Sequence, residues 1–177
     1  MNDAEERVTA DLVVAAFIRK ARGEILFVPR KGRWTLPTGH LHPSDEGDMQ
    51  AALRREMKEE LGVEIFINDS LGKFFRKENR NGRSKYIETF YCTISGAESK
   101  NVHYDEKGEV GHIWLTVEEA GQRDDLDDLA KASLDSFCQK LSQITRRGYG
   151  AKGRRGRGSS GSGSGRKLCH QVWVASV

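Results

Sequence analysis

The feature that most constrains this chain is an acidic segment whose charges would share one side of a helix. Residues 55–63 read REMKEELGV, which places three glutamates and an arginine within six positions. An α-helix turns by about 100° per residue, so Glu56, Glu59 and Glu60 would crowd onto about a third of its circumference. Beside them runs an apolar strip made of Leu53, Met57 and Leu61. Three like charges at this spacing repel one another, and helix formation alone does not explain them.

A divalent cation would remove this repulsion. Mg²⁺ and Mn²⁺ favour oxygen ligands, and Mg²⁺ commonly uses one or two carboxylates together with waters and substrate phosphates. The alternative is a solvated acidic helix face, the usual explanation of a charge run. Three features favour the metal site: a glycine in the preceding loop, a glycine directly after the acidic turn, and the position of Glu56 and Glu60 against the apolar strip.

The stretch from Gly39 to Val63 resembles the signature box of the Nudix hydrolases, G-x5-E-x7-R-E-U-x-E-E-x-G-U, where U is aliphatic. Residues 55–63 match every fixed position of the second half. In the first half, six residues separate Gly39 from Glu46 where the family has five. Eight residues then separate Glu46 from Arg55 where the family has seven.

Family spacing counted back from Arg55 would instead select Leu41 and Gly47. We prefer Gly39 and Glu46, because residues 36–41, LPTGHL, also resemble the family's approach to the box. Single-residue insertions in a loop and a first helical turn are physically tolerable.

The resemblance implies roles for the matched positions. Metal binding and water activation would be shared by Glu56, Glu59 and Glu60, and the carbonyl group of Gly39 would add a ligand. Arg55 would orient one of the carboxylates.

The family often places its general base either on the box helix or on a later loop. We expect Glu56 to act from the box and Glu106 or Glu109 to contribute from the polar loop before His112. For the two loop residues, ordinary loop acidity is the alternative explanation.

Basic residues around the box are candidates for binding substrate phosphates, with plain surface charge as the alternative. They are Arg30, Arg33 and Lys77. No serine or cysteine nucleophile with an adjacent base is apparent in the sequence. Direct attack by a metal-activated water is therefore the simplest mechanism for cleaving a phosphoanhydride.

The patterns before and within the box alternate between strand and helix. Residues 12–19 and 25–28 read as a hairpin with Gly23 at its tip. A helix beginning at Asp45 or Glu46 would end at Gly62 and lead into a strand over residues 63–67.

The second half continues in the same way. Strands are predicted over residues 71–77, 85–94 and 112–115, with Asn81-Gly82 in the turn between the first two. Thr116 and Glu119 form a capping-box pattern, and a longer helix fits residues 125–144. These elements predict an α/β domain with helices packed on a mixed sheet, and the resemblance implies the Nudix α/β/α sandwich.

The length of 177 residues suits a single domain. We divide the chain into an N-terminal extension (1–10), a Nudix hydrolase domain (11–145) and a basic tail (146–177) rich in glycine, serine and arginine. The tail carries eight Lys/Arg and no Asp/Glu, so the first 145 residues have a net charge of −5. Such a tail is expected to be disordered. It could contact RNA, or it is a solubilising extension.

Three widely spaced cysteines with no metal-like or disulfide-like pattern indicate a reducing compartment. The N-terminus does not read as a signal peptide, and no apolar run approaches the ~20 residues of a membrane span. We therefore expect a cytoplasmic protein without a membrane partner. The oligomeric state is not readable from the sequence.

The functional prediction is a hydrolase that depends on Mg²⁺, or Mn²⁺ in its place. Its substrate would be a nucleoside diphosphate linked to another moiety, as in a nucleotide, a sugar nucleotide or a dinucleoside polyphosphate. Two alternatives stay open: an RNA decapping pyrophosphohydrolase, and a non-catalytic nucleotide- or RNA-binding module of the same fold.

Overall fold

The computed structural model describes residues 11–77, 84–106 and 108–149, without the side chains of 76–77 and 145–149. Its strands are β1 (Asp11–Arg19), β2 (Ile25–Arg30), β3 (Arg33–Thr35), β4 (Thr38–His40), β5 (Phe66–Lys77), β6 (Ser84–Thr93), β7 (Asp105–Glu106), β8 (Glu109–Val110) and β9 (Ile113–Leu115). Its helices are α1 (Met49–Leu61), α2 (Val117–Gly121) and α3 (Asp128–Tyr149), with short 3₁₀ turns η1 (Pro43–Asp45) and η2 (Glu98–Lys100).

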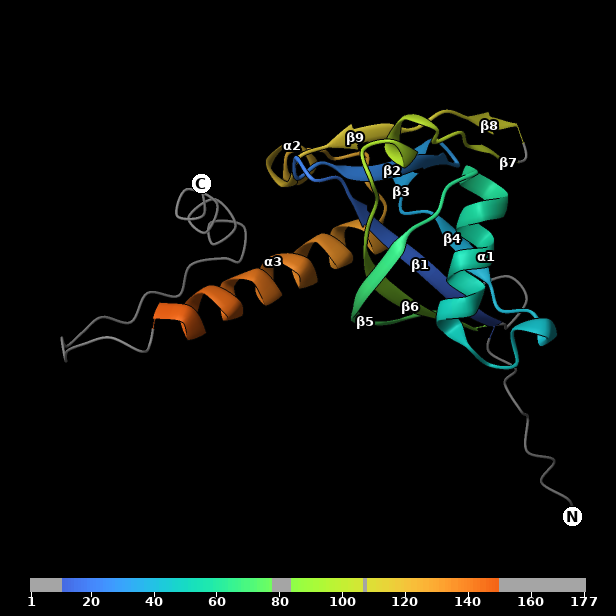
Figure 1. Ribbon diagram of the computed structural model, residues 1–177, viewed down its shortest axis with the longest axis horizontal. Helices are drawn as coiled ribbons and strands as arrows, with labels where there is room; N and C mark the ends of the chain where they lie inside the picture. The colour runs from blue at the N-terminus through green and yellow to red at the C-terminus, as the bar shows by residue number, and fades with distance from the viewer. Residues whose placement is uncertain (1–10, 78–83, 107, 150–177) are drawn as a thin grey trace, which may run out of the picture.

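The main sheet is mixed and has β1 at its centre. Its strand order is β3-β2-β1-β6-β5, with β4 paired to β1 and β9 paired to β2. Strands β1 and β6 run parallel along their whole length, whereas the other described pairs of this sheet are antiparallel. A parallel pair needs a long connection between its strands, and α1 lies within that connection (Figure 1). The predicted mixed α/β architecture is confirmed.

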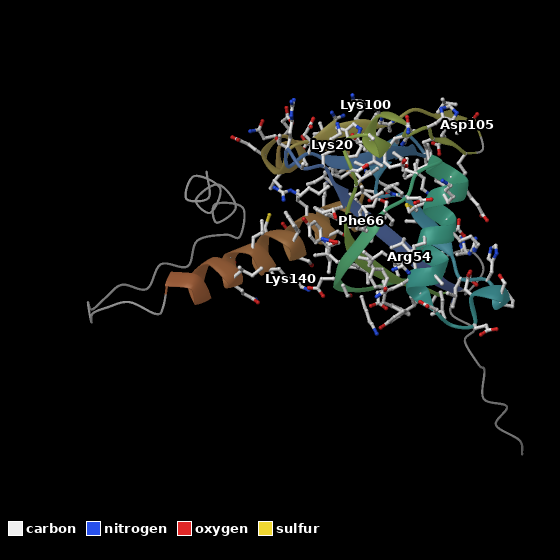
Figure 2. All side chains as sticks on the ribbon, in the orientation of Figure 1. Lys20, Arg54, Phe66, Lys100, Asp105 and Lys140 are labelled. Atoms are coloured by element: carbon white, nitrogen blue, oxygen red, sulfur yellow. The ribbon has the colours of Figure 1, made fainter. Side chains whose placement is uncertain are left out.

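The apolar run of β1 explains why both faces of the sheet are covered. Successive strand residues point to opposite faces. Val14, Ala16 and Ile18 therefore join the core under α1, whereas Phe17 joins the core under α2 and α3. Figure 1 shows α1 packed against the strands and α3 extending away from the body of the sheet. Lys140 of α3, labelled in Figure 2, binds Asp69 of β5 with 2.6 Å between Nζ and Oδ2.

The ends of α1 correct one prediction and confirm another. The helix begins at Met49, because the side chain of Asp48 caps it by accepting hydrogen bonds from the backbone N–H groups of Gln50 and Ala51. The expected start at Asp45 or Glu46 is wrong. At the other end Gly62 adopts a left-handed conformation with φ of 71°, as expected of a glycine that stops a helix.

Several other boundaries differ from the prediction. The strand expected from residue 63 begins only at Phe66, and the polar loop expected before His112 contains η2 and the hairpin of β7 and β8. Helix α3 continues to Tyr149, past the predicted start of the tail at residue 146. The Asn81-Gly82 turn and residues 150–177 lie outside the described residues. Among the described helices, none combines the length and the apolar character needed to span a bilayer.

Candidate active site

The acidic side of α1 meets the backbone of β4, and the contact is tight. Glu56 is only 7% exposed. A Cβ atom added to Gly39 would lie 2.0 Å from Glu56 Cγ, so only glycine leaves room for this side chain. The N–H of His40 donates to Glu56 Oε1 at 3.1 Å. The glycine that opens the box is thus required by the close approach of a carboxylate.

Arg55 connects the acidic groups. Its Nη1 atom lies 3.0 Å from Glu56 Oε1 and 3.2 Å from Glu59 Oε2. Its Nη2 atom donates to the carbonyl oxygen of His40 at 3.0 Å. The fork of the guanidinium also binds Asp45, with Nε 3.1 Å from Oδ1 and Nη2 2.9 Å from Oδ2. Bidentate pairing of this kind fixes orientation as well as distance. These contacts raise the pKa of Arg55, chiefly through its hydrogen bonds to Asp45.

In the first half of the box, Asp45 and not Glu46 is the carboxylate that contacts Arg55. The Asp45 side chain is 6% exposed, and its Oδ2 atom also accepts a hydrogen bond from the N–H of His42 at 2.7 Å. Glu46 is exposed and ends η1 in a left-handed conformation with φ of 51°. The structure thus pairs Arg55 with Asp45 and not with Glu46, the residue preferred from the sequence. Asp45 follows Gly39 after five residues, which is the family spacing.

The other two box glutamates differ in exposure. The side chain of Glu59 is 60% exposed, whereas Glu60 is half-buried. The charge of Glu60 helps to raise the pKa of Tyr104, which places Glu60 near the core side of the helix. In the part of the chain that the structure describes, no three Asp, Glu, His or Cys side chains already converge as a metal-ligand set.

The donor set nevertheless has the chemistry of a hard-cation site. Arg55 is in contact with three carboxylates, from Asp45, Glu56 and Glu59. Arg55 supplies one positive charge to these three carboxylates, and Glu60 lies on the same helix. Carboxylate oxygens are the ligands that Mg²⁺ and Mn²⁺ prefer. The residues present therefore fit such an ion.

The two acidic candidates from the later loop have separate partners. Strand β7 packs against α1, at the C-terminal end of the helix (Figure 1). Glu106 of β7 accepts a hydrogen bond from the hydroxyl group of Tyr104, with 2.9 Å between the oxygens. Glu109 of β8 instead accepts a hydrogen bond from the backbone N–H of Lys31 in the turn between β2 and β3. Only Glu106 is thus brought toward the box helix.

The basic candidates for phosphate binding also differ in their positions. Arg30 is half-buried and donates from Nη1 to Thr38 Oγ1 at 3.0 Å. Thr38 precedes Gly39 in β4, so Arg30 lies near the strand that contacts Glu56. Arg33 is exposed and lies directly opposite Arg30 in the β2–β3 pair. The side chain of Lys77 lies outside the described residues.

Two residues at the site were not identified from the sequence. Asp45 could have been found by keeping the five-residue spacing and accepting aspartate in place of glutamate. Tyr104 carries no local signal, because its relation to Glu106 depends on the packing of its ring under α1.

Comparison with known proteins gives the same assignment. Residues 9–137 match the NUDIX domain family. Comparison of the sequence with curated proteins returned no match.

Several solved structures share the fold. The MutT protein from Methanosarcina mazei Go1 is 18% identical over 74% of this chain and 94% of its own, with a TM-score of 0.59. A C. elegans Ap4A hydrolase binary complex is 22% identical over 76% of this chain and 99% of its own, with a TM-score of 0.59. The NUDIX domain of Shewanella oneidensis NrtR, complexed with ADP ribose, is 15% identical over 79% of this chain and 94% of its own, with a TM-score of 0.56. The family match, the fold and the box helix agree, and the chain belongs to the Nudix family of hydrolases.

Proposed function

We propose that this Nudix hydrolase cleaves a phosphoanhydride bond in a nucleoside diphosphate linked to another moiety, by direct attack of water. The single observation that carries the proposal is the packing of Glu56 against Gly39, with Arg55 holding that carboxylate beside Glu59. A folded chain has no structural need to crowd these charges together. The arrangement suits a site that binds a cation and a polyphosphate.

The residues that would hold the ion are Glu56, Glu59 and Glu60, with the carbonyl group of Gly39. When bound, a divalent cation lowers the pKa of an attacking water and offsets phosphate charge. Arg55 holds both Glu56 and Glu59 through its Nη1 atom. Glu56 and Glu106 are the candidates for accepting the proton of that water, because both carboxylates are held by hydrogen bonds near the box helix.

Arg30 is the strongest candidate for a phosphate ligand. Its side chain donates to Thr38, next to Gly39 in β4, and Arg33 stands opposite it across the β2–β3 pair. Like charges directly opposite in a sheet are destabilising, so an anion between the two guanidinium groups would relieve their repulsion. Phosphoryl transfer depends mainly on positioning and charge neutralisation, which such a pair supplies.

The relatives support a nucleotide-type substrate without selecting one. The structural neighbours include a protein described as an Ap4A hydrolase and a domain complexed with ADP ribose. Both of these ligands contain phosphoanhydride bonds.

The test is a substrate panel with purified protein and Mg²⁺. The panel holds nucleoside triphosphates, sugar nucleotides, ADP ribose, a dinucleoside polyphosphate and capped RNA, with products identified by chromatography. We expect cleavage of at least one phosphoanhydride substrate. Glu56→Gln should lower the rate by about 10³-fold with the circular dichroism spectrum unchanged. Glu60→Gln should abolish most activity for the same reason.

Glu64→Gln is the matched control, because Glu64 is an exposed glutamate just after the helix. It should retain the wild-type rate. Full activity in both Glu56→Gln and Glu60→Gln would contradict the site. Cleavage of capped RNA alone would favour the decapping alternative.

A further inference from the structure

We propose that Tyr104 is a positioning residue that holds the carboxylate of Glu106 toward the box helix. The inference rests on the proposed function, since it assigns Glu106 to the reacting water. It concerns a residue outside the box, in the segment just before β7.

The pairing of β7 with β8 brings two carboxylates close together, and the hydrogen bond from Tyr104 holds one of them. Glu106 and Glu109 lie directly opposite each other in this antiparallel pair, so their side chains share one face and repel. Separate donors draw them apart. Glu106 Oε2 accepts from the hydroxyl group of Tyr104 at 2.9 Å, and Glu109 Oε1 accepts from the N–H of Lys31. The two acids therefore point to different neighbours, and the Glu106 carboxylate is the one kept next to α1.

Tyr104 is itself firmly placed. It is 3% exposed, and its ring belongs to the core cluster that contains the buried side of α1. Its carbonyl group accepts from the N–H of Gly111 at 3.0 Å. The preceding residue, His103, donates from its N–H to the carbonyl group of Leu61 at 3.1 Å. The position of the hydroxyl group relative to α1 is thus set by packing and by backbone hydrogen bonds.

The hydroxyl group acts as a donor. Burial, followed by the hydrogen bond to Glu106 and the charges of Glu106 and Glu60, raises the pKa of Tyr104. The phenol therefore keeps its proton at neutral pH. A donated hydrogen bond stabilises a carboxylate and restricts its rotamers. The simpler explanation is that Glu106 only provides an acceptor for a buried hydroxyl group. The kcat values of variants distinguish this structural role from the positioning role.

The experiment compares Tyr104→Phe, Glu106→Gln and the double variant, using the substrate that the panel identifies. Tyr104→Phe keeps the ring in the core and removes only the donor. We expect kcat to fall about tenfold with KM within about twofold of wild type, the size of effect seen when a supporting hydrogen bond is lost. Glu106→Gln should lower kcat by about 100-fold. The double variant should match Glu106→Gln, because Tyr104 acts through that carboxylate.

Tyr91→Phe is the control, since Tyr91 packs with Phe17 and Phe137 on the opposite face of the sheet. It should leave kcat unchanged. A wild-type kcat in Tyr104→Phe would overturn the role of Tyr104 and leave that of Glu106 intact. The same conclusion would follow if the kcat of the double variant fell by the product of the two single losses. Full activity in Glu106→Gln would overturn both the role of Glu106 and this inference. Absence of hydrolysis by the wild type would overturn the proposed function and the inference with it.

Discussion

Helices α1 and α3 cover opposite faces of the same sheet but bury different kinds of side chain. In α3 the inward side chains are almost all apolar or small, with Leu129, Ala130, Leu134 and Phe137 in the core. In α1 the buried set includes Leu53, Met57 and Leu61, and also Glu56. Burying a carboxylate is unfavourable unless hydrogen bonds and opposite charges compensate it. Of these two helices, α1 is the one with a buried carboxylate among its described side chains.

The compensation in α1 comes from outside the helix as well as from within it. Arg55 belongs to the helix, but Asp45 and the backbone of His40 reach Arg55 and Glu56 from η1 and β4. A buried ion pair is a weak source of stability, and well-packed apolar residues often do better. Helix α3 therefore mainly stabilises the fold, whereas α1 gives up some stability to hold its charged groups.

The largest effect is expected from Arg55→Ala. Removing the guanidinium leaves the buried Glu56 without its opposite charge, which should cost about 3–5 kcal/mol of stability. Activity should fall about 100-fold or more, because the carboxylates lose their common partner. Urea unfolding and steady-state kinetics measure the two effects.

The matched control is Arg54→Ala. Arg54, labelled in Figure 2, is the neighbouring arginine of α1 and is exposed. Its loss should change stability by no more than about 0.5 kcal/mol. Equal effects of the two variants would show that Arg55 has no special role.

A change in α3 should affect stability without affecting chemistry. Phe137 packs against Phe17 and Tyr91, with ring centroids 4.8 Å and 5.3 Å away. Phe137→Ala should cost about 3–5 kcal/mol through the cavity that it leaves. The kcat of the remaining folded protein should stay near wild type at low temperature. A loss of kcat as large as that of Arg55→Ala would mean that the two faces are not independent.

Gly39→Ala should damage both stability and activity. The added methyl group would lie 2.0 Å from Glu56 Cγ, so either β4 or α1 must move. Overpacking of this kind costs about 1–3 kcal/mol. Gly96→Ala is the control, because a Cβ atom there meets nothing within 4 Å. Thermal melts and rates of both variants are the measurement, and a Gly39→Ala variant as active as Gly96→Ala would contradict the close contact with Glu56.

Asp45→Asn should lower activity less than Arg55→Ala and should differ in activity from Glu46→Gln. We expect a loss of about 10–100-fold in activity when Arg55 loses its charged partner outside the helix. Glu46→Gln should be neutral, since Glu46 is exposed. The reverse result would restore Glu46 to the box.

Acid titration gives a second test of Asp45. The hydrogen bond from Arg55, followed by the N–H of His42, holds the pKa of Asp45 below its ordinary value of 3.8. Because the folded-state pKa is depressed, the stabilisation is present above that ordinary value and is lost as the pH falls through the folded-state pKa. Asp45→Asn should therefore weaken the loss of stability in acid, as measured by urea unfolding between pH 5 and pH 2.

The second half of the box was predictable because its pattern is local. Helical spacing places Glu56, Glu59 and Glu60 together whatever surrounds them, and Gly62 ends the helix by its own backbone preference. The first half was less predictable. Whether Asp45 or Glu46 meets Arg55 depends on the path of a 3₁₀ turn, and a shift of one residue in such a turn redirects the side chain.

The family, the mixed α/β fold and the acidic helix were readable from the sequence. The box motif indicates the family, and repeating patterns of charged and apolar residues indicate which faces are buried. The packing of the folded chain determines which carboxylates lie beside Arg55 and the box helix. Asp45 reaches Arg55 through η1, and Glu106 rather than Glu109 is held near α1 by Tyr104. These partners come from η1 and from the two-residue strand β7, which are too short to carry a periodic signal, so their contacts exist only once the sheet and helices have packed.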